Sequence, residues 1–293
     1  MGGKRFKLAV FTDEVSQDFG RAVDFAKEFG LDGIEIRSVW NKPPHKLDPD
    51  DVRRMRSILK GTNLAVASIA SPFFKCELDS AREREEHMDI LHRSAELGRA
   101  FDCRLVRGFA FWRRKDLGAV KRRIVEIFAE EVIGAAEKED IILGIENEAS
   151  TYLGRCDEVA DFLGNFDSPH VAAIYDPANS LQAAPKEIPY PDGYEALKGR
   201  IAHFHLKDAA PNPEDTQVVN VPVGEGEVDF AGLFRAMIAD GYTGFASLET
   251  HWRPKRPISG RMQETPGGRE FSDTAEEASH ICMARLKEIL AGL

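Results

Sequence analysis

The sequence predicts an α/β fold, a single (β/α)8 barrel (TIM barrel), in which eight parallel strands, each followed by a helix, close into a ring. Eight short apolar runs rich in Val, Ile and Phe alternate with amphipathic stretches of helical spacing. The first run is not followed by the GxGxxG turn of a doubly wound dinucleotide-binding sheet. Two smaller α/β domains are the alternative, but no Pro/Ser/Gly-rich linker divides the chain. We therefore expect residues 1–293 to form one domain.

The apolar runs are the expected barrel strands. Their short length and their β-branched and aromatic residues are typical of buried strands. In chain order they cover residues 6–11, 33–39, 64–70, 104–111, 141–147, 171–176, 201–207 and 245–250.

Stretches with helical periodicity separate these strands. The expected helices cover residues 18–29, 49–60, 80–100, 117–138, 156–164, 193–199, 229–240 and 273–291. Asp48 ahead of Pro49 and Asp273 ahead of TAEEA are typical helix start signals, and Gly30 and Gly241 are stop signals.

Two connections, 208–228 and 251–272, are much longer than the others. Loops of about 20 residues in a compact domain are usually functional lids or disordered segments. In a barrel, both follow strands at the face where the C-terminal strand ends gather, which is where barrel enzymes keep their active sites. We expect the active site on that face, and we expect 251–272 to be a mobile cover.

Composition excludes several classes of function. With 39 Lys and Arg against 49 Asp and Glu, the formal charge is -10, which disfavours nucleic acid as a partner. The four cysteines are widely separated and form no CxxC pair, so we do not expect a zinc–thiolate site. The same spacing is typical of a protein from a reducing compartment. The first apolar run ends at Phe11, too early for a signal peptide, and no run approaches the ~18 residues of a membrane span. We expect a cytoplasmic protein without a membrane partner.

Polar side chains end four consecutive strands. Glu146, Asp176, His205 and Glu249 end strands five to eight, about one strand plus one helix apart. A lone acid at a strand end is more often a cap or a rim salt bridge, but four in matching places favour a shared site. Three carboxylates and one imidazole form an oxygen-rich ligand set that suits Mn²⁺, Mg²⁺ or Co²⁺.

The runs IEN, YDPAN, HLKD and LET at these strand ends resemble those of the xylose-isomerase-like sugar phosphate isomerases and epimerases. That family also includes the ketose 3-epimerases and, more distantly, endonuclease IV. The resemblance covers the whole barrel and implies that the four strand-end residues bind a divalent metal ion. It also implies that Glu146 and Glu249 exchange a proton with the substrate through an enediolate. Lys207 would face the substrate and stabilise the enediolate, with Asp208 orienting Lys207.

Other residues near the expected site are candidates for substrate contact. Asn179 stands where epimerases of this family often carry His, and unlike His it cannot titrate. Arg107 and Trp112 end strand four, Lys75 follows strand three, and His251 follows Glu249; for Trp112 and its neighbours, plugging the barrel mouth is the alternative.

Two further residues, His203 and Glu35, are expected to support the site. His203 shares a strand face with His205 but lies one layer deeper, which favours a supporting role over ligation. Glu35 is the expected buried partner of Arg37.

The resemblance favours a metal-dependent isomerase or epimerase acting on a sugar or sugar derivative. The same site could instead serve a lyase or C-glycoside-cleaving enzyme on 3-keto sugars, because the first proton step is shared. A phosphodiesterase like endonuclease IV is disfavoured, since the histidines do not match its three-metal cluster and the charge is -10. A non-catalytic sugar-binding barrel and assembly into a homo-oligomer remain open.

Overall fold

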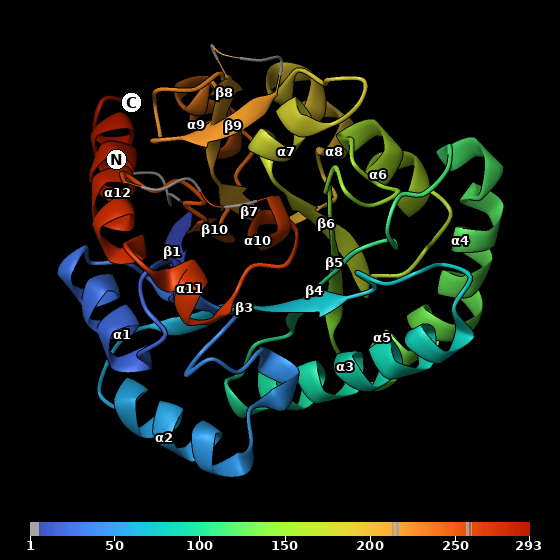
Figure 1. Ribbon diagram of the computed structural model, residues 1–293, viewed down its shortest axis with the longest axis horizontal. Helices are drawn as coiled ribbons and strands as arrows, with labels where there is room; N and C mark the ends of the chain where they lie inside the picture. The colour runs from blue at the N-terminus through green and yellow to red at the C-terminus, as the bar shows by residue number, and fades with distance from the viewer. Residues whose placement is uncertain (1–5, 213, 215–216, 256–257, 259) are drawn as a thin grey trace.

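A computed structural model describes residues 6–212, 214, 217–255, 258 and 260–293. Eight parallel strands close into a barrel in the order β1-β10-β7-β6-β5-β4-β3-β2, which confirms the predicted fold class (Figure 1). The strands are β1 (Lys7–Phe11), β2 (Gly33–Ile36), β3 (Ala65–Phe73), β4 (Leu105–Gly108), β5 (Ile142–Glu146), β6 (Val171–Tyr175), β7 (Ile201–Leu206) and β10 (Phe245–Leu248). All eight expected strands are present. β4 is shorter than expected, and Phe111 beyond it adopts a positive φ of 61°.

Most helices also match their predicted places. They are α1 (Phe19–Glu28), α2 (Pro49–Leu59), α3 (Ala81–Ala100), α4 (Lys121–Ile127), α5 (Ile133–Lys138), α6 (Cys156–Leu163), α8 (Tyr194–Leu197), α9 (Phe230–Ala239) and α12 (Ala275–Ala291). A π-helical segment, Phe128–Val132, joins α4 to α5, so the predicted helix over 117–138 is interrupted.

The helix start signals were right in one case and wrong in the other. Asp48 caps α2, accepting hydrogen bonds from the backbone N–H groups of Asp50 and Asp51. Asp273 does not cap α12, because Thr274, with a φ of 58°, lies between it and the first helical residue.

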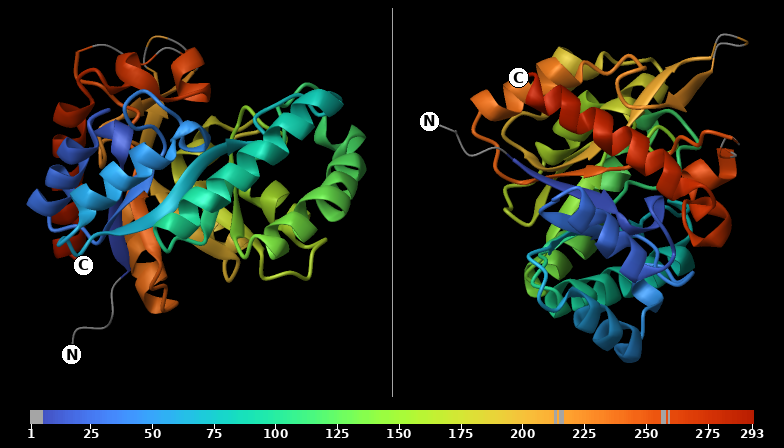
Figure 2. Two further views of the ribbon diagram at one scale, coloured as in Figure 1. Left: turned by 90° about the horizontal axis from the view of Figure 1, so that it is seen from below. Right: turned by 90° about the vertical axis from the view of Figure 1, so that its left-hand side faces the viewer.

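Both long connections contain regular structure that the sequence did not reveal. Within 208–228, β8 (Asp208–Pro211) and β9 (Val218–Val221) pair as an antiparallel hairpin. Within 251–272 lie two short helices, α10 (Gly260–Glu264) and α11 (Gly268–Ser272); residues 256, 257 and 259 of this predicted cover lie outside the described residues. A further short helix that was not expected, α7 (Pro177–Gln182), follows β6. The hairpin and the helices α10 and α11 lie on the same side of the barrel (Figure 2).

The core is continuous from the barrel interior to the surrounding helices. Val10, Ile34, Leu143 and Ile174 are fully buried strand residues within it. All four cysteines are buried and free, as expected from their spacing. Within the described ranges, no helix has both the length and the apolar character needed to cross a membrane.

Candidate metal centre and active site

The four predicted ligand residues converge at the C-terminal ends of their strands. Glu146 is the last residue of β5, Asp176 follows β6, His205 lies in β7, and Glu249 follows β10. One ligand atom from each lies within 4.8 Å of those of the other three. All four side chains are at most 2% exposed. The parallel barrel therefore gathers these side chains into one buried cluster, which is consistent with a divalent metal site.

The carboxylate of Asp176 fits a bound cation. Its Oδ1 accepts hydrogen bonds from the backbone N–H groups of Ala178 (2.9 Å) and Asn179 (3.2 Å) and so caps α7. Its buried Oδ2 accepts no hydrogen bond from the described residues, although Lys207 Nζ lies 3.0 Å away. Burial raises the pKa of Asp176 to about 7, against the opposing charge of Lys207. A buried carboxylate oxygen without a hydrogen bond is costly unless a cation compensates it.

His205 presents one ring nitrogen to the cluster. Its Nδ1 lies 3.0 Å from Glu146 Oε1 and 3.9 Å from Glu249 Oε2. Its Nε2 lies 3.3 Å from Glu35 Oε1 on the other side of the ring. Burial alone would lower the pKa of His205, but the Glu146 and Glu35 carboxylates raise it to about 10. Because a metal ligand must be a neutral imidazole, an ion here would compete with that proton.

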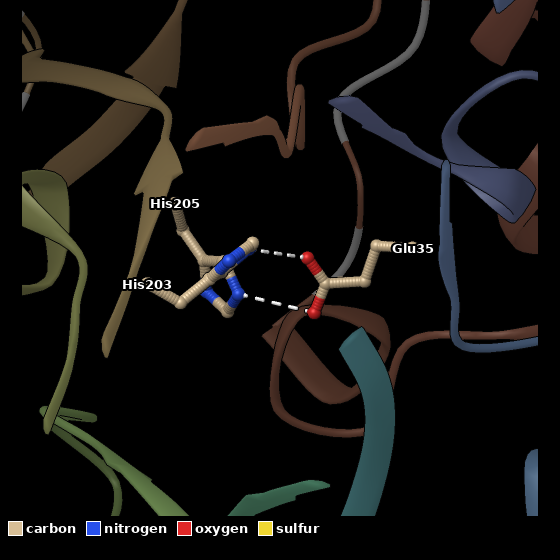
Figure 3. Close-up of side chains that lie close together, drawn as sticks. All are labelled: Glu35, His203 and His205. Atoms are coloured by element: carbon tan, nitrogen blue, oxygen red, sulfur yellow. Dashed lines mark hydrogen bonds and ion pairs between the residues drawn. The ribbon is translucent and has the colours of Figure 1, made fainter. Parts of the chain in front are cut away.

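Glu35, in β2, is a functional candidate whose role the sequence analysis missed. Its carboxylate bridges two histidines, with Oε2 2.8 Å from His203 Nε2 and Oε1 3.3 Å from His205 Nε2 (Figure 3). Burial opposes ionisation, but His203 and His205 lower the pKa of Glu35 well below its usual range. The predicted pairing of Glu35 with Arg37 is wrong. A carboxylate behind a ligand histidine fixes the ring and its tautomer.

Lys207 lies among the carboxylates of the cluster. Its Nζ is 3.0 Å from Asp176 Oδ2 and 3.3 Å from Glu249 Oε2. Burial alone would lower the pKa of Lys207, but these carboxylates raise it above its usual range. Lys207 is therefore a charged hydrogen-bond donor at neutral pH.

Asp208 does not orient Lys207, contrary to the expectation. It accepts hydrogen bonds from the backbone N–H groups of Ala209 (2.9 Å), Gly224 (2.8 Å), Gly226 (3.0 Å) and Val228 (3.2 Å). The Asp208 carboxylate thus folds the base of the β8–β9 hairpin. A Cβ at Gly226 would lie 2.1 Å from Asp208 Oδ1, so the turn needs a glycine there.

Arg37, which follows β2, is the second residue that the sequence analysis undervalued. Its Nη1 donates to Glu249 Oε1 (2.5 Å), its Nη2 to Glu14 Oε1 (2.9 Å), and its Nε to both oxygens of Asp13 (3.1 Å). The guanidinium is 3% exposed and lies over the ring of Phe11. This buried arginine holds one oxygen of Glu249, while the other oxygen faces His205 and Lys207.

Two cavities flank the cluster. The first, of about 310 Å³, is called the mouth cavity here; its lining includes Glu148, Asn179, Lys207, Asn220 and His251. The second, of about 220 Å³, is called the side cavity; its lining includes Arg37, Lys75, His87, Arg107 and Pro266. Glu264, at the end of α10, lines both.

The predicted substrate contacts divide between these cavities. Asn179 and His251 line the mouth cavity, and Asn179 Nδ2 lies 3.3 Å from Glu146 Oε1. Lys75 and Arg107 line the side cavity, and Arg107 Nη1 lies 3.1 Å from Glu146 Oε2. Trp112 lines neither of the two; its backbone forms a β-bridge with Thr151.

The structure defines the class of this protein: a TIM barrel with a buried cluster of His, Asp and Glu at its C-terminal strand ends, consistent with a divalent metal site. The particular family follows from the chain itself. The family described as "Xylose isomerase-like TIM barrel" matches residues 23–275, and this chain belongs to that family. Its members are mostly metal-dependent sugar isomerases and epimerases.

The individual relatives share little sequence identity with this chain. The chain is 26% identical over 207 residues to SgbU of Escherichia coli K12, inferred to be an L-ribulose-5-phosphate 3-epimerase, covering 68% of this chain and 69% of that protein. A xylose isomerase domain protein from Planctomyces limnophilus superimposes with a TM-score of 0.74 at 15% identity, covering 98% and 97% of the chains. The 3-keto-D-glucoside 4-epimerase YcjR from E. coli gives 0.68 at 16%, covering 97% and 100%. These structural likenesses show the shared fold.

Proposed function

We propose that this single-domain protein is a divalent-metal-dependent isomerase or epimerase of a sugar or sugar derivative. The observation that carries the proposal is the buried cluster of Glu146, Asp176, His205 and Glu249, with ligand atoms within 4.8 Å of one another. The cluster lies beside a cavity lined by Lys207 and Asn179. Carboxylates beside a small cavity that a lysine and an amide line suit proton transfer at a carbon next to a carbonyl.

The proposed roles follow from the position of each group. A bound Mn²⁺, Mg²⁺ or Co²⁺ ion would act as a Lewis acid on the substrate carbonyl. Lys207 donates a hydrogen bond to the enediolate oxygen, and Asn179 donates a second one. Glu146 and Glu249 remove and return the proton. Burial opposes ionisation of Glu249, but Lys207, His251 and Arg37 lower its pKa well below its usual range, so it is a weak base. Stabilisation of the enediolate must therefore supply much of the rate enhancement.

Elimination from a 3-keto sugar is the second candidate, and one feature favours it. Each glutamate has an oxygen held by an arginine, Glu146 Oε2 by Arg107 (3.1 Å) and Glu249 Oε1 by Arg37 (2.5 Å). Asn179 also replaces the titrating histidine of related epimerases. An elimination needs one proton removed and none returned to the opposite face, so it places a smaller demand on these weak bases.

The substitutions Glu249→Gln and Lys207→Met test the proposed roles in proton transfer and enediolate stabilisation. Glu249→Gln keeps an oxygen for the metal but removes the titrating group, so metal should stay partly bound while proton exchange falls by roughly 10² to 10⁴. Lys207→Met should leave metal affinity nearly unchanged and slow the same step. Metal content by mass spectrometry and exchange rates are measured on the same samples. Normal turnover of Glu249→Gln on the true substrate would exclude this assignment.

A solvent-deuterium exchange screen separates the candidate functions. Ketoses, 3-keto glycosides and their phosphates are incubated with Mn²⁺ in D₂O and followed by NMR. Deuterium in recovered sugar with inverted configuration indicates epimerisation, and release of the glycosidic group indicates elimination. Sugar binding without any exchange would mean a non-catalytic barrel and would overturn both enzymatic candidates.

A further inference from the structure

Three cationic side chains line the side cavity. Arg37, Lys75 and Arg107 all line it, and their side chains are at most 7% exposed. Its other walls include the apolar residues Ala70 and Ile90. Charges surrounded by apolar walls interact more strongly than charges in water.

His87 adds a fourth donor. Its Nδ1 lies 2.8 Å from the backbone nitrogen of Phe74, which donates to it. Nδ1 is therefore the unprotonated nitrogen, and in the neutral ring Nε2 must carry the proton. Burial lowers the pKa of His87 to about 4, so the ring is neutral at pH 7. His87 thus contributes an N–H donor to this cavity.

The cations of the side cavity are held in place by acids that do not line it. Lys75 Nζ pairs with Glu148 (3.2 Å), and Arg107 Nη1 pairs with Glu146 (3.1 Å). Among the described residues that line this cavity, Glu264 is the one acid; it is exposed, and its backbone carbonyl accepts a hydrogen bond from Lys75 (2.7 Å).

Donor capacity remains at Arg107. Beyond Glu146, it donates to the carbonyl oxygens of Ser71 (3.3 Å) and Ala70 (3.4 Å), both long contacts. A guanidinium has five N–H groups, of which three donate to these acceptors within the described residues, and Nη1 also lies 3.9 Å from Glu249 Oε1, beyond hydrogen-bond distance. A buried donor of this kind favours an acceptor brought by a ligand.

We infer that the side cavity is an oxyanion subsite and that the substrate is an acidic sugar, bearing a carboxylate or a phosphate that binds Arg107, Lys75 and His87. This inference rests on the proposed function, since it concerns the substrate of the same site. The cavity of about 220 Å³ suits one substituent rather than a whole sugar, and the mouth cavity of about 310 Å³ accommodates the reacting carbons. Glu264 lines both cavities, which places them next to each other. In this cavity side chains donate the hydrogen bonds that the backbone N–H groups of a glycine-rich loop donate to phosphate in other folds.

Anion binding to the metal-depleted protein tests the subsite independently of catalysis. Inorganic phosphate and malonate are titrated in chloride-free buffer with EDTA, and affinity is followed by calorimetry and thermal shift. Lys75→Met and His87→Asn should each weaken anion binding by roughly 10-fold or more, the loss of one charged or buried hydrogen bond. Asn keeps an acceptor near the position of Nδ1 for the Phe74 N–H and removes only the distal donor. The control is Lys115→Met, which removes an exposed lysine outside both cavities and should bind anions normally.

A second arm compares matched substrates in the deuterium-exchange screen. A ketopentose is compared with its 5-phosphate, and a ketohexose with the corresponding hexuronate, which separates phosphate from carboxylate as the natural group. The acidic member of one pair should exchange with a lower KM, and Lys75→Met should raise that KM at least 10-fold more than it raises the KM of the neutral member. Equal anion affinity in all variants, or faster exchange of both neutral sugars, overturns the subsite. If no compound exchanges but the anion result holds, the proposed reaction fails and the subsite stands.

Discussion

At the scale of single residues, the orientation of Glu249 and His205 depends on the buried side chains of Arg37 and Glu35, which contact them. Arg37 ties Glu249 to Asp13 and Glu14, and Glu35 ties His205 to His203. These contacts lie behind the cluster and fix which oxygen or nitrogen faces its centre. Ligands that are already oriented lose less conformational entropy on binding, so these two residues should affect metal affinity and turnover together.

Replacing Arg37 by Lys tests this positioning role. Lysine keeps the charge but cannot donate to Asp13, Glu14 and Glu249 at once, so Glu249 should lose its fixed orientation. We expect metal affinity to fall roughly 10-fold and kcat to fall more than KM rises. Metal affinity is measured by calorimetry and turnover by deuterium exchange.

Arg113→Lys is the matched control for this experiment. Arg113 also holds a carboxylate with one nitrogen, at 2.8 and 2.9 Å from the two oxygens of Glu158, but it lines neither cavity. The control should leave metal affinity and kcat unchanged. An Arg37→Lys protein as active as Arg113→Lys would show that Arg37 only stabilises the fold.

The stability of the protein should depend on pH through His87. Burial lowers its pKa from 6.5 to about 4, so the folded state binds this proton more weakly than the unfolded chain. Its contribution is present above pH 6.5 and is lost as pH falls toward 4. Between pH 6.5 and 4.5, wild type should lose more free energy of unfolding than His87→Asn, by on the order of 1–2 kcal/mol. Urea denaturation across this range measures the difference, and parallel losses in both proteins would contradict it.

At the scale of elements, the connections after β7 and β10 shape the access to the site. Asn220 of β9 and Gly260 of α10 line the mouth cavity. The helix α11 is anchored to the N-terminal part of the chain, because Gln17 donates to the Gly268 carbonyl (3.2 Å) and to Ser272 Oγ (3.0 Å). The helix α10 is joined to the barrel by the hydrogen bond from Lys75 to the Glu264 carbonyl (2.7 Å).

This difference in anchoring indicates that α10 is the part of the predicted cover that moves. Amide hydrogen exchange should be faster in α10 than in α11, because among the described residues Lys75 makes one hydrogen bond to α10 whereas Gln17 makes two to α11. Saturating substrate should slow exchange in α10 and leave α11 nearly unchanged. Peptide-resolved exchange with mass spectrometry measures both, and α6, which lines neither cavity, is the internal control. Exchange in α10 that does not respond to substrate would contradict the cover.

At the scale of the whole molecule, metal binding should couple to stability. The cluster brings three carboxylates together in the interior, where Lys207, Arg37 and Arg107 balance part of their charge and a divalent cation would balance more of it. The four residues lie at the ends of β5, β6, β7 and β10 of one closed barrel, so an ion that bound all four would stabilise the folded state.

Removal of metal should therefore lower the melting temperature. At an ion concentration 100 times its Kd, the gain in free energy of unfolding is about 2.7 kcal/mol. Asp176→Asn should abolish the difference between Mn²⁺-loaded and EDTA-treated protein, whereas Asp161→Asn, an exposed helix residue, should keep it. Scanning calorimetry measures both variants. A Mn²⁺-dependent shift that survives in Asp176→Asn would place the ion elsewhere.

The sequence by itself determined the barrel and the residues at its mouth. Alternation of apolar runs and helical stretches predicted all eight strands, because buried strands and amphipathic helices each have a characteristic spacing of apolar residues. The strand-end positions of Glu146, Asp176, His205 and Glu249 predicted their convergence, because parallel strands in a barrel end on one face. The roles of these residues as ligands and catalysts stay predictions.

Only the tertiary structure decided which side chains meet across the barrel. Glu35 faces His203 and His205 rather than Arg37, Asp208 folds the hairpin rather than orienting Lys207, and the side cavity unites Lys75 with Arg107. The reason is that such contacts join segments distant in sequence, and their geometry depends on strand register and loop path. A local pattern records which residues are buried, but it does not record their partners.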